Sequence, residues 1–355
     1  MHGGDIYSDH VDIDFSVNLN PVNPSDEDEA AIRDAVAAGI ENAGVYPDIL
    51  QRNVRSMIAL SEGVKNGCVC AANGASELIM AAVSMISPGR ALLIEPSFLG
   101  YRRSLDSAGC EIKEYFLKEE DEFCLKSDVI SYLSKGIDMV FLQDPWNPVG
   151  KNIDDGLLNL ILDKADSLGI TVVLDESFFM LSDKSLERSG GYTAELIDRY
   201  GRLIIIKSYT KSFALPGFRM GYAVSSEKMT GKLTGHLPEW NLSSVADAVM
   251  GACAKTVLKG EYLKSSAEYI RTEREHLIKD LKSLGLKVYG SDTVFVLFKY
   301  EGGTDLYGEL LKKGILIRDC KDIPGLGRGF YRVSVKSRAD NERLIRVIGE
   351  TINGN

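Results

Sequence analysis

Short apolar segments alternate with helical segments through the middle of the chain, and this alternation restricts the fold more than any other feature. Helical patterns separate apolar runs at residues 91–95, 138–143, 170–175 and 202–207. Strands that are separated by helices pair in parallel and form a sheet that is buried on both faces. We therefore predict an α/β fold whose large domain is a mainly parallel sheet flanked by helices.

The pattern changes near residue 240, which indicates a second, smaller domain. Two long helical segments are followed by the apolar stretches "TVFVLFKY", "ILIRD" and "FYRVSVKS" and by a terminal helix. At the other end, the glycine- and proline-containing first 24 residues indicate an extended arm, and Ser25 begins a helix with an acidic first turn. We predict an N-terminal arm and first helix at 1–40, a large domain at 41–240 and a small α+β C-terminal domain at 241–355.

The composition restricts the partners and the location of the protein. The formal net charge of -10 argues against nucleic acid and anionic membrane surfaces as partners. No apolar run approaches the roughly 20 residues that a membrane-spanning helix needs, and the first ten residues lack the apolar core of a signal peptide. The six cysteines are scattered and there are four histidines, so we expect free thiols in a reducing cytoplasm and no metal site.

Polar residues gather where the predicted strands end, which is where ligands bind in such sheets. Asn147, Asp175, Ser208 and Lys211 all follow apolar runs. Lys211 is either an ordinary surface lysine or a lysine whose amine forms a Schiff base with a carbonyl. Ser208 and the nearby Arg219 suit a phosphate group, because hydroxyls and guanidinium groups donate hydrogen bonds to it.

Pyridoxal 5'-phosphate (PLP) is a ligand that carries both a carbonyl and a phosphate. This cofactor also needs an acid beside its pyridinium nitrogen, and Asp175 ends a strand 36 residues before Lys211. Asp175 is either that acid or a simple helix cap. The first interpretation is favoured because Asp, Asn and Lys stand at the ends of three separate strands.

Several motifs in order then give a family resemblance. The segment "SYTKSFALPGFRMGY" (208–222), the "NPVG" at 147–150 and the strand that ends in Asp175 resemble the signature of fold-type I PLP enzymes of the class I/II aminotransferase superfamily. The likeness extends from "YPD" at 46 to "YRVSV" at 331.

The resemblance implies roles for the residues that match the family's motifs. Lys211 would bind the cofactor covalently and later move the proton, Asp175 would pair with the ring nitrogen, and Asn147 would donate to the ring hydroxyl. The cofactor phosphate would be held by a second set of residues: Gly74, Ala75, Ser76, Ser208 and Arg219.

Three further residues match the family at single positions. Phe98 would stack on the face of the cofactor ring, or else be a core phenylalanine. Arg332 would hold the α-carboxylate of the substrate through two parallel hydrogen bonds, or else be a surface residue of a strand. Tyr46 would reach the cofactor phosphate of the neighbouring subunit, which implies a homodimer.

The chain departs from the family at residue 178, where many members have a tyrosine and this sequence has Phe178. A phenyl ring cannot donate to the ring oxygen, so a standard transaminase is in doubt. The N-terminal "HGGDIY" and "DFSVNLNP" resemble the arm of L-threonine-O-3-phosphate decarboxylases, which are cobalamin-pathway relatives of histidinol-phosphate aminotransferases. His2 would then help to hold the substrate phosphate, unless it is merely a disordered terminal residue.

The first hypothesis is therefore a PLP-dependent decarboxylase of L-threonine phosphate, and the second an aminotransferase similar to histidinol-phosphate aminotransferase. A non-catalytic regulator with the PLP fold would fit the loss of Lys211 or Asp175, but both are present. A Rossmann dehydrogenase is disfavoured because the glycine fingerprint is missing.

Overall fold

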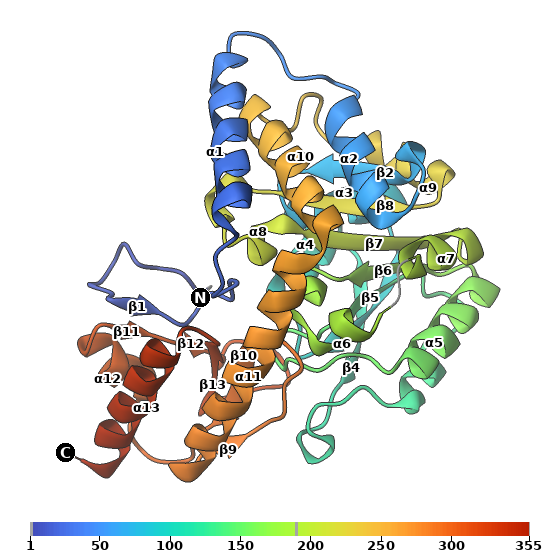
Figure 1. Ribbon diagram of the computed structural model, residues 1–355. Helices are drawn as coiled ribbons and strands as arrows, with labels where there is room; N and C mark the ends of the chain where they lie inside the picture. The colour runs from blue at the N-terminus through green and yellow to red at the C-terminus, as the bar shows by residue number, and fades with distance from the viewer. Residues whose placement is uncertain (1–2, 189–190, 355) are drawn as a thin grey trace.

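The computed structural model describes residues 3–188 and 191–354, and a large seven-stranded sheet forms its centre (Figure 1). The strands, in order across the sheet, are β2 (Val69–Ala72), β8 (Gly221–Ser225), β7 (Leu203–Ser208), β6 (Thr171–Asp175), β5 (Met139–Gln143), β3 (Arg90–Glu95) and β4 (Glu111–Phe116). The five strands from β7 to β4 are parallel, and β8 is antiparallel to both of its neighbours. The prediction of a mainly parallel sheet is confirmed.

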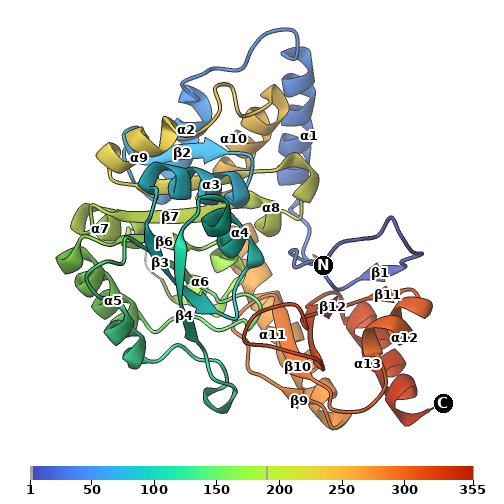
Figure 2. The ribbon, with the colours of Figure 1, turned by 180° about the vertical axis from the view of Figure 1, so that it is seen from behind.

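Helices cover both faces of this sheet, as expected for strands that are apolar on both sides. One face packs on α3 (Ala75–Ile86), α4 (Leu99–Ser107) and α9 (Glu227–Thr234), as Figure 2 shows from behind. The other face packs on α2 (Arg52–Glu62), α5 (Asp155–Leu168), α7 (Tyr192–Arg199) and α10 (Ser244–Lys259). Side chains of α1 (Asp26–Glu41) and α10 share this second core. The predicted helices at 99–108 and 154–168 are confirmed within one residue.

A smaller antiparallel sheet lies below the first in Figure 1. Its strands, in order, are β12 (Arg318–Asp319), β13 (Phe330–Ser334), β10 (Phe295–Lys299) and β9 (Lys287–Val288). It packs with α11 (Glu261–Ser283), α12 (Leu306–Lys312) and α13 (Arg338–Asn353) around a separate apolar core. The predicted domain boundaries at 40/41 and 240/241 stay predictions.

The remaining elements are short. They are α6 (Asp183–Glu187), α8 (Tyr209–Ser212) and the 3-10 turns η1 (Asn66–Cys68), η2 (Glu119–Asp121), η3 (Ser127–Tyr132), η4 (Phe179–Leu181) and η5 (Pro216–Phe218). Within the described ranges, no helix combines the length and the apolar character needed to cross a bilayer.

The stretch "ILIRD", expected as one strand, is divided between two sheets. Residues 315–316 form β11 (Ile315–Leu316), which pairs in parallel with β1 (Ile13–Asp14) of the N-terminal arm, whereas β12 pairs with β13. The arm is thus fastened to the segment that leads into the small sheet. The predicted start of α1 is confirmed, because the Ser25 side chain accepts a hydrogen bond from the Asp28 N–H.

Candidate active site

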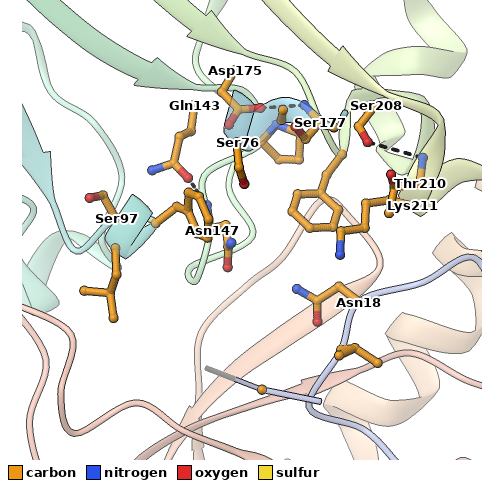
Figure 3. Close-up of a pocket in the computed structure, with 18 of the residues that line it drawn as sticks. Asn18, Ser76, Ser97, Gln143, Asn147, Asp175, Ser177, Ser208, Thr210 and Lys211 are labelled. Carbon is orange, nitrogen blue, oxygen red and sulfur yellow. Dashed lines mark hydrogen bonds between the residues drawn. The ribbon is translucent and has the colours of Figure 1, made fainter. Parts of the chain in front are cut away.

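A cavity of about 410 Å³ opens at the carboxyl ends of the parallel strands, between the two sheets (Figure 3). Residues from the large sheet, the small sheet and the N-terminal arm line it together. The structure brings most of the predicted site residues to this cavity: Gly74, Ala75, Ser76, Phe98, Asn147, Asp175, Ser208, Lys211, Arg219 and Arg332. Their placement follows from the parallel topology, since the ends of parallel strands meet at one edge.

Lys211 lies in the one-turn helix α8, which directly follows strand β7. Burial of its side chain, together with the positive charges of Arg332 and Arg219, lowers the pKa of Lys211 to about 8. The Nζ atom lies 5.9 Å from the centre of the Phe178 ring. An amine with such a pKa is partly neutral near physiological pH, and a neutral amine can attack a carbonyl.

Asp175 ends strand β6, and both of its carboxylate oxygens accept hydrogen bonds from neutral donors. Oδ1 accepts from the Ser177 N–H at 2.9 Å, and Oδ2 accepts from the Tyr101 hydroxyl at 2.5 Å. Burial raises the pKa of Asp175, while these hydrogen bonds oppose the rise. A buried carboxylate of this kind is stabilised by a cationic partner, so the position fits a protonated ring nitrogen.

The N-terminus of α3 forms an anion cradle with Arg219. The first N–H groups of a helix have no partner within the helix and attract anions. Gly74 precedes the helix with φ +80°, and a Cβ atom there would lie 3.0 Å from Arg219 Nη2. At Gly221 a Cβ atom would lie 2.5 Å from the Gly74 carbonyl carbon. Two glycines therefore let β8 and the guanidinium approach the turn, which fits a phosphate group.

Ser208, at the end of β7, stands beside this cradle. Its hydroxyl donates to the Met220 carbonyl at 2.9 Å and accepts from the Thr210 N–H at 3.2 Å. The Thr210 hydroxyl donates to the same carbonyl at 3.0 Å. The two hydroxyls thus fix the loop that carries Arg219.

Arg332, on β13, is buried and reaches the cavity from the small sheet. It donates to Asn147 Oδ1 at 2.5 Å and to the Ser16 carbonyl at 2.7 Å. Its Nε atom has no hydrogen-bond partner among the described residues. Burial lowers the pKa of Arg332 to about 10.

One predicted residue lies outside the cavity, and another lies outside the described residues. The Tyr46 side chain is 79% exposed, and its ring centre lies 4.9 Å from that of Trp240, outside the cavity. His2 lies outside the described residues, although Gly3 lines the cavity. The roles assigned to both stay predictions.

The sequence pattern does not indicate several cavity residues and their neighbours. Asn18, Gln143 and Arg318 line the cavity, and Tyr101 lies directly behind Asp175. Tyr101 stands three residues after Phe98, a spacing that places side chains close together on a helix, and the two rings meet edge to face at 5.5 Å. That spacing was the available signal. The position of Arg318 depends on its pairing with β13, which the local sequence does not reveal.

Comparison with known proteins assigns this architecture to the fold-type I enzymes that use PLP. Residues 11–348 match the family model described as "Aminotransferase class I and II", and the chain belongs to this family. The predictions of a PLP cofactor and of an enzyme are thereby confirmed.

Two relatives with different activities are each 30% identical to the chain, but over different shares of its length. The threonine-phosphate decarboxylase of Salmonella typhimurium is 30% identical over 96% of this chain and 92% of its own length. The histidinol-phosphate aminotransferase of Caldanaerobacter subterraneus subsp. tengcongensis is 30% identical over 88% of this chain and 85% of its own length. The crystal structure of the histidinol-phosphate aminotransferase from Clostridium acetobutylicum superimposes with a TM-score of 0.86 at 28% identity, covering 96% of this chain and 99% of that one.

Proposed function

We propose that the protein decarboxylates a phosphorylated amino acid, with L-threonine O-3-phosphate as the substrate, in the cobalamin pathway that the arm's resemblance implies. The supporting observation is the charge of the cavity. Among the described residues that line the cavity, one is acidic, Asp175, and four are cationic: Lys211, Arg219, Arg318 and Arg332. Arg318 and Arg332 are buried, and buried charges need partners of opposite sign, so this cavity suits ligands that carry several negative charges.

The anions of cofactor and substrate account for the three arginines, while Lys211 is the residue proposed to bind the cofactor covalently. The cradle with Arg219 suits the cofactor phosphate, and Arg332 suits the α-carboxylate of an amino acid. Arg318 is then left for a further anion. Its Cα pairs with that of Arg332 across strands β12 and β13, and both residues line the cavity. A phosphate on the substrate side chain supplies that anion, whereas plain threonine does not.

Bound PLP supplies an electron sink that accepts the electron pair of the bond that breaks at Cα. Asp175 would hold a proton on the ring nitrogen and so keep that sink strong. Arg332 would fix the carboxylate that leaves as carbon dioxide, and Lys211 Nζ would deliver the proton that replaces it at Cα. Phe98 would cover one face of the ring, which also excludes water.

Phe178 supports decarboxylation over standard transamination. It lines the cavity near Lys211 and packs edge to face on Phe295 at 5.2 Å. Its phenyl group donates no hydrogen bond, so Asn147 would be the donor to the ring oxygen at this side.

We also propose a homodimer. Tyr46, Trp240 and their neighbours Ile49 and Leu50 are exposed apolar side chains, and apolar side chains that gather on one surface suit a subunit interface. A second copy there would bring Tyr46 toward the neighbouring cradle, as in the family. The six free cysteines further support a reducing, cytoplasmic location.

A second candidate is an aminotransferase that acts on histidinol phosphate. The same neighbouring pair, Arg318 and Arg332, favours it to some degree, because two guanidinium groups can bind one phosphate together. This substrate has no α-carboxylate, so the phosphate would take the place of that group.

The product profile tests the proposal. The PLP-loaded protein is incubated with L-threonine phosphate, with and without 2-oxoglutarate, and with histidinol phosphate as the comparison substrate. We expect carbon dioxide and phosphorylated 1-amino-2-propanol from L-threonine phosphate, at a rate that 2-oxoglutarate does not change. Glutamate formation from histidinol phosphate, without carbon dioxide from L-threonine phosphate, would instead establish the aminotransferase.

A further inference from the structure

Residues 15–20 of the N-terminal arm, which we call the strap, connect the small sheet to helix α8, which carries Lys211. At one end, the Phe15 carbonyl accepts from the Ser334 N–H at 2.9 Å, and the next carbonyl of the strap accepts from the Arg332 guanidinium. At the other end, the Asn20 N–H donates to the Lys211 carbonyl at 3.0 Å. Figure 1 shows the arm passing α8 before it enters α1.

The side chain of Asn20 is buried and fully used. It is 5% exposed, and its Nδ2 atom lies 2.9 Å from the Ser212 carbonyl, from the Tyr262 hydroxyl and from Ser266 Oγ. Its Oδ1 atom accepts from the Val22 N–H at 3.0 Å. Asn20 is not among the described residues that line the cavity. Its contacts therefore hold neighbouring segments of the chain and do not bind a ligand directly.

These contacts stabilise a helix that cannot stabilise itself. Helix α8 has four residues, Tyr209–Ser212, which is about one turn. A single turn fixes several backbone dihedrals in return for few internal hydrogen bonds. At its end the Lys211 carbonyl accepts a local bond from the Ala214 N–H at 3.3 Å, and the Ser212 carbonyl accepts from the Tyr262 hydroxyl at 3.1 Å. Asn20 supplies donors to two successive carbonyls of that end, at Lys211 and Ser212.

We propose that Asn20 is a positioning residue for Lys211: by holding the carbonyls of residues 211 and 212, it fixes the backbone from which the lysine reaches the cofactor. This inference rests on the proposed role of Lys211 as the residue that binds PLP. A displaced lysine would still lie in the cavity, but it would meet the reacting carbon in the correct geometry less often.

The same strap contacts both Arg332 and Lys211, the residues proposed to bind the substrate carboxylate and to deliver the proton. Arg332 is held by the Ser16 carbonyl, and Lys211 by the Asn20 N–H. The group that fixes the substrate carboxylate and the group that delivers the proton are therefore placed by backbone atoms four residues apart. An arm that loosened at Asn20 would disturb Lys211 without removing any cavity side chain.

The experiment measures how fast Lys211 captures PLP. Apoenzyme is mixed with PLP, samples are quenched with borohydride at intervals, and peptide mapping gives the labelled fraction of Lys211. In Asn20→Ser the hydroxyl can still accept from the Val22 N–H, but it is too short to reach the Ser212 carbonyl. We expect capture and kcat to fall about 10-fold, with KM for L-threonine phosphate unchanged.

Two further variants complete the design. Asn20→Asp keeps the volume but turns an oxygen toward the Ser212 carbonyl, so it should also slow capture, and it serves if Asn20→Ser does not fold. Ser266→Ala is the matched control, because it removes one partner of Asn20 and leaves both contacts to residues 211 and 212. It should capture PLP at the wild-type rate.

The outcomes separate this inference from the proposed function. If the folded Asn20 variants label Lys211 at the wild-type rate with unchanged kcat, the positioning role is wrong. The same holds if Ser266→Ala slows capture equally, because the effect would then be general loosening. If the wild-type protein labels a different lysine or none, the proposed role of Lys211 itself fails.

Discussion

Arg332 donates a 2.5 Å hydrogen bond to Asn147 Oδ1. Arg332 lies on strand β13 of the small sheet, whereas Asn147 lies in the loop after strand β5 of the large sheet. Because the amide oxygen faces the guanidinium, the Nδ2 group of Asn147 is left free to turn into the cavity. The residue proposed for the substrate carboxylate therefore orients the residue proposed for the ring oxygen.

Arg332→Lys should lower kcat/KM about 10²-fold for every amino acid substrate alike. Lysine keeps the charge but cannot donate in a fork, and it cannot hold Asn147 and a carboxylate at once. The absorption spectrum of bound PLP should also shift, since Asn147 loses its fixed orientation. Steady-state kinetics with L-threonine phosphate and with plain L-threonine check this. A loss confined to the phosphorylated substrate would mean that Arg332 binds phosphate instead.

Arg318→Gln, in contrast, should weaken only substrates that carry a side-chain phosphate. Arg318 lines the cavity beside Arg332, and the proposal assigns it to the side-chain phosphate. Its replacement should lower the ratio of kcat/KM for L-threonine phosphate over L-threonine by about 10-fold or more, the effect of a lost charge-assisted hydrogen bond. An unchanged ratio would show that the phosphate is bound elsewhere.

The sequence could predict the strand-end residues because their placement follows from topology alone. Once 170–175 and 202–207 are parallel neighbours, Asp175 and Lys211 must meet at one edge. Arg318 could not be predicted in this way, because the apolar stretch 315–319 is shared between two sheets and its pairing partners come from distant segments. Asn20 was likewise hidden, since its partners lie roughly 190 to 250 residues away and only the folded chain brings them together.

Tyr101→Phe should destabilise the apoenzyme by about 1–3 kcal/mol, because Asp175 Oδ2 loses its donor while it stays buried. Activity of the loaded enzyme should change as well, since Asp175 becomes more basic. Urea denaturation of the apoenzyme gives the first value, and kcat gives the second.

Tyr115→Phe is the matched control for this prediction. Its hydroxyl donates to Asp128 Oδ1 at 2.6 Å, and the Tyr115 ring is buried outside the cavity. It should lose stability and keep kcat. Equal losses of kcat in both variants would indicate that Tyr101 acts only through stability.

PLP capture by the apoenzyme should depend on pH with a midpoint near the lowered pKa of Lys211, about 8. Below this pH the ammonium form predominates and cannot attack a carbonyl, so capture slows as the pH falls. Above it the amine is neutral and the rate should level off. An unperturbed lysine would give a rise that continues toward about pH 10.4. Borohydride trapping at a series of pH values measures the profile, and a continuing rise would contradict the buried, electropositive setting of Lys211.

Mixed dimers should reveal whether Tyr46 acts across the proposed interface. Lys211→Ala and Tyr46→Ala subunits are each expected to have little activity alone. In a mixed dimer, the site of the Tyr46→Ala subunit keeps its own Lys211 and receives Tyr46 from the Lys211→Ala partner, so one complete site is restored. If Tyr46 instead served its own subunit, each site would lack one residue and mixing would restore no activity.

The two variant subunits are unfolded together, refolded and assayed, with each refolded variant alone as the control. Activity well above the mean of the two controls supports a shared site, and sedimentation must show a dimer for the comparison to count.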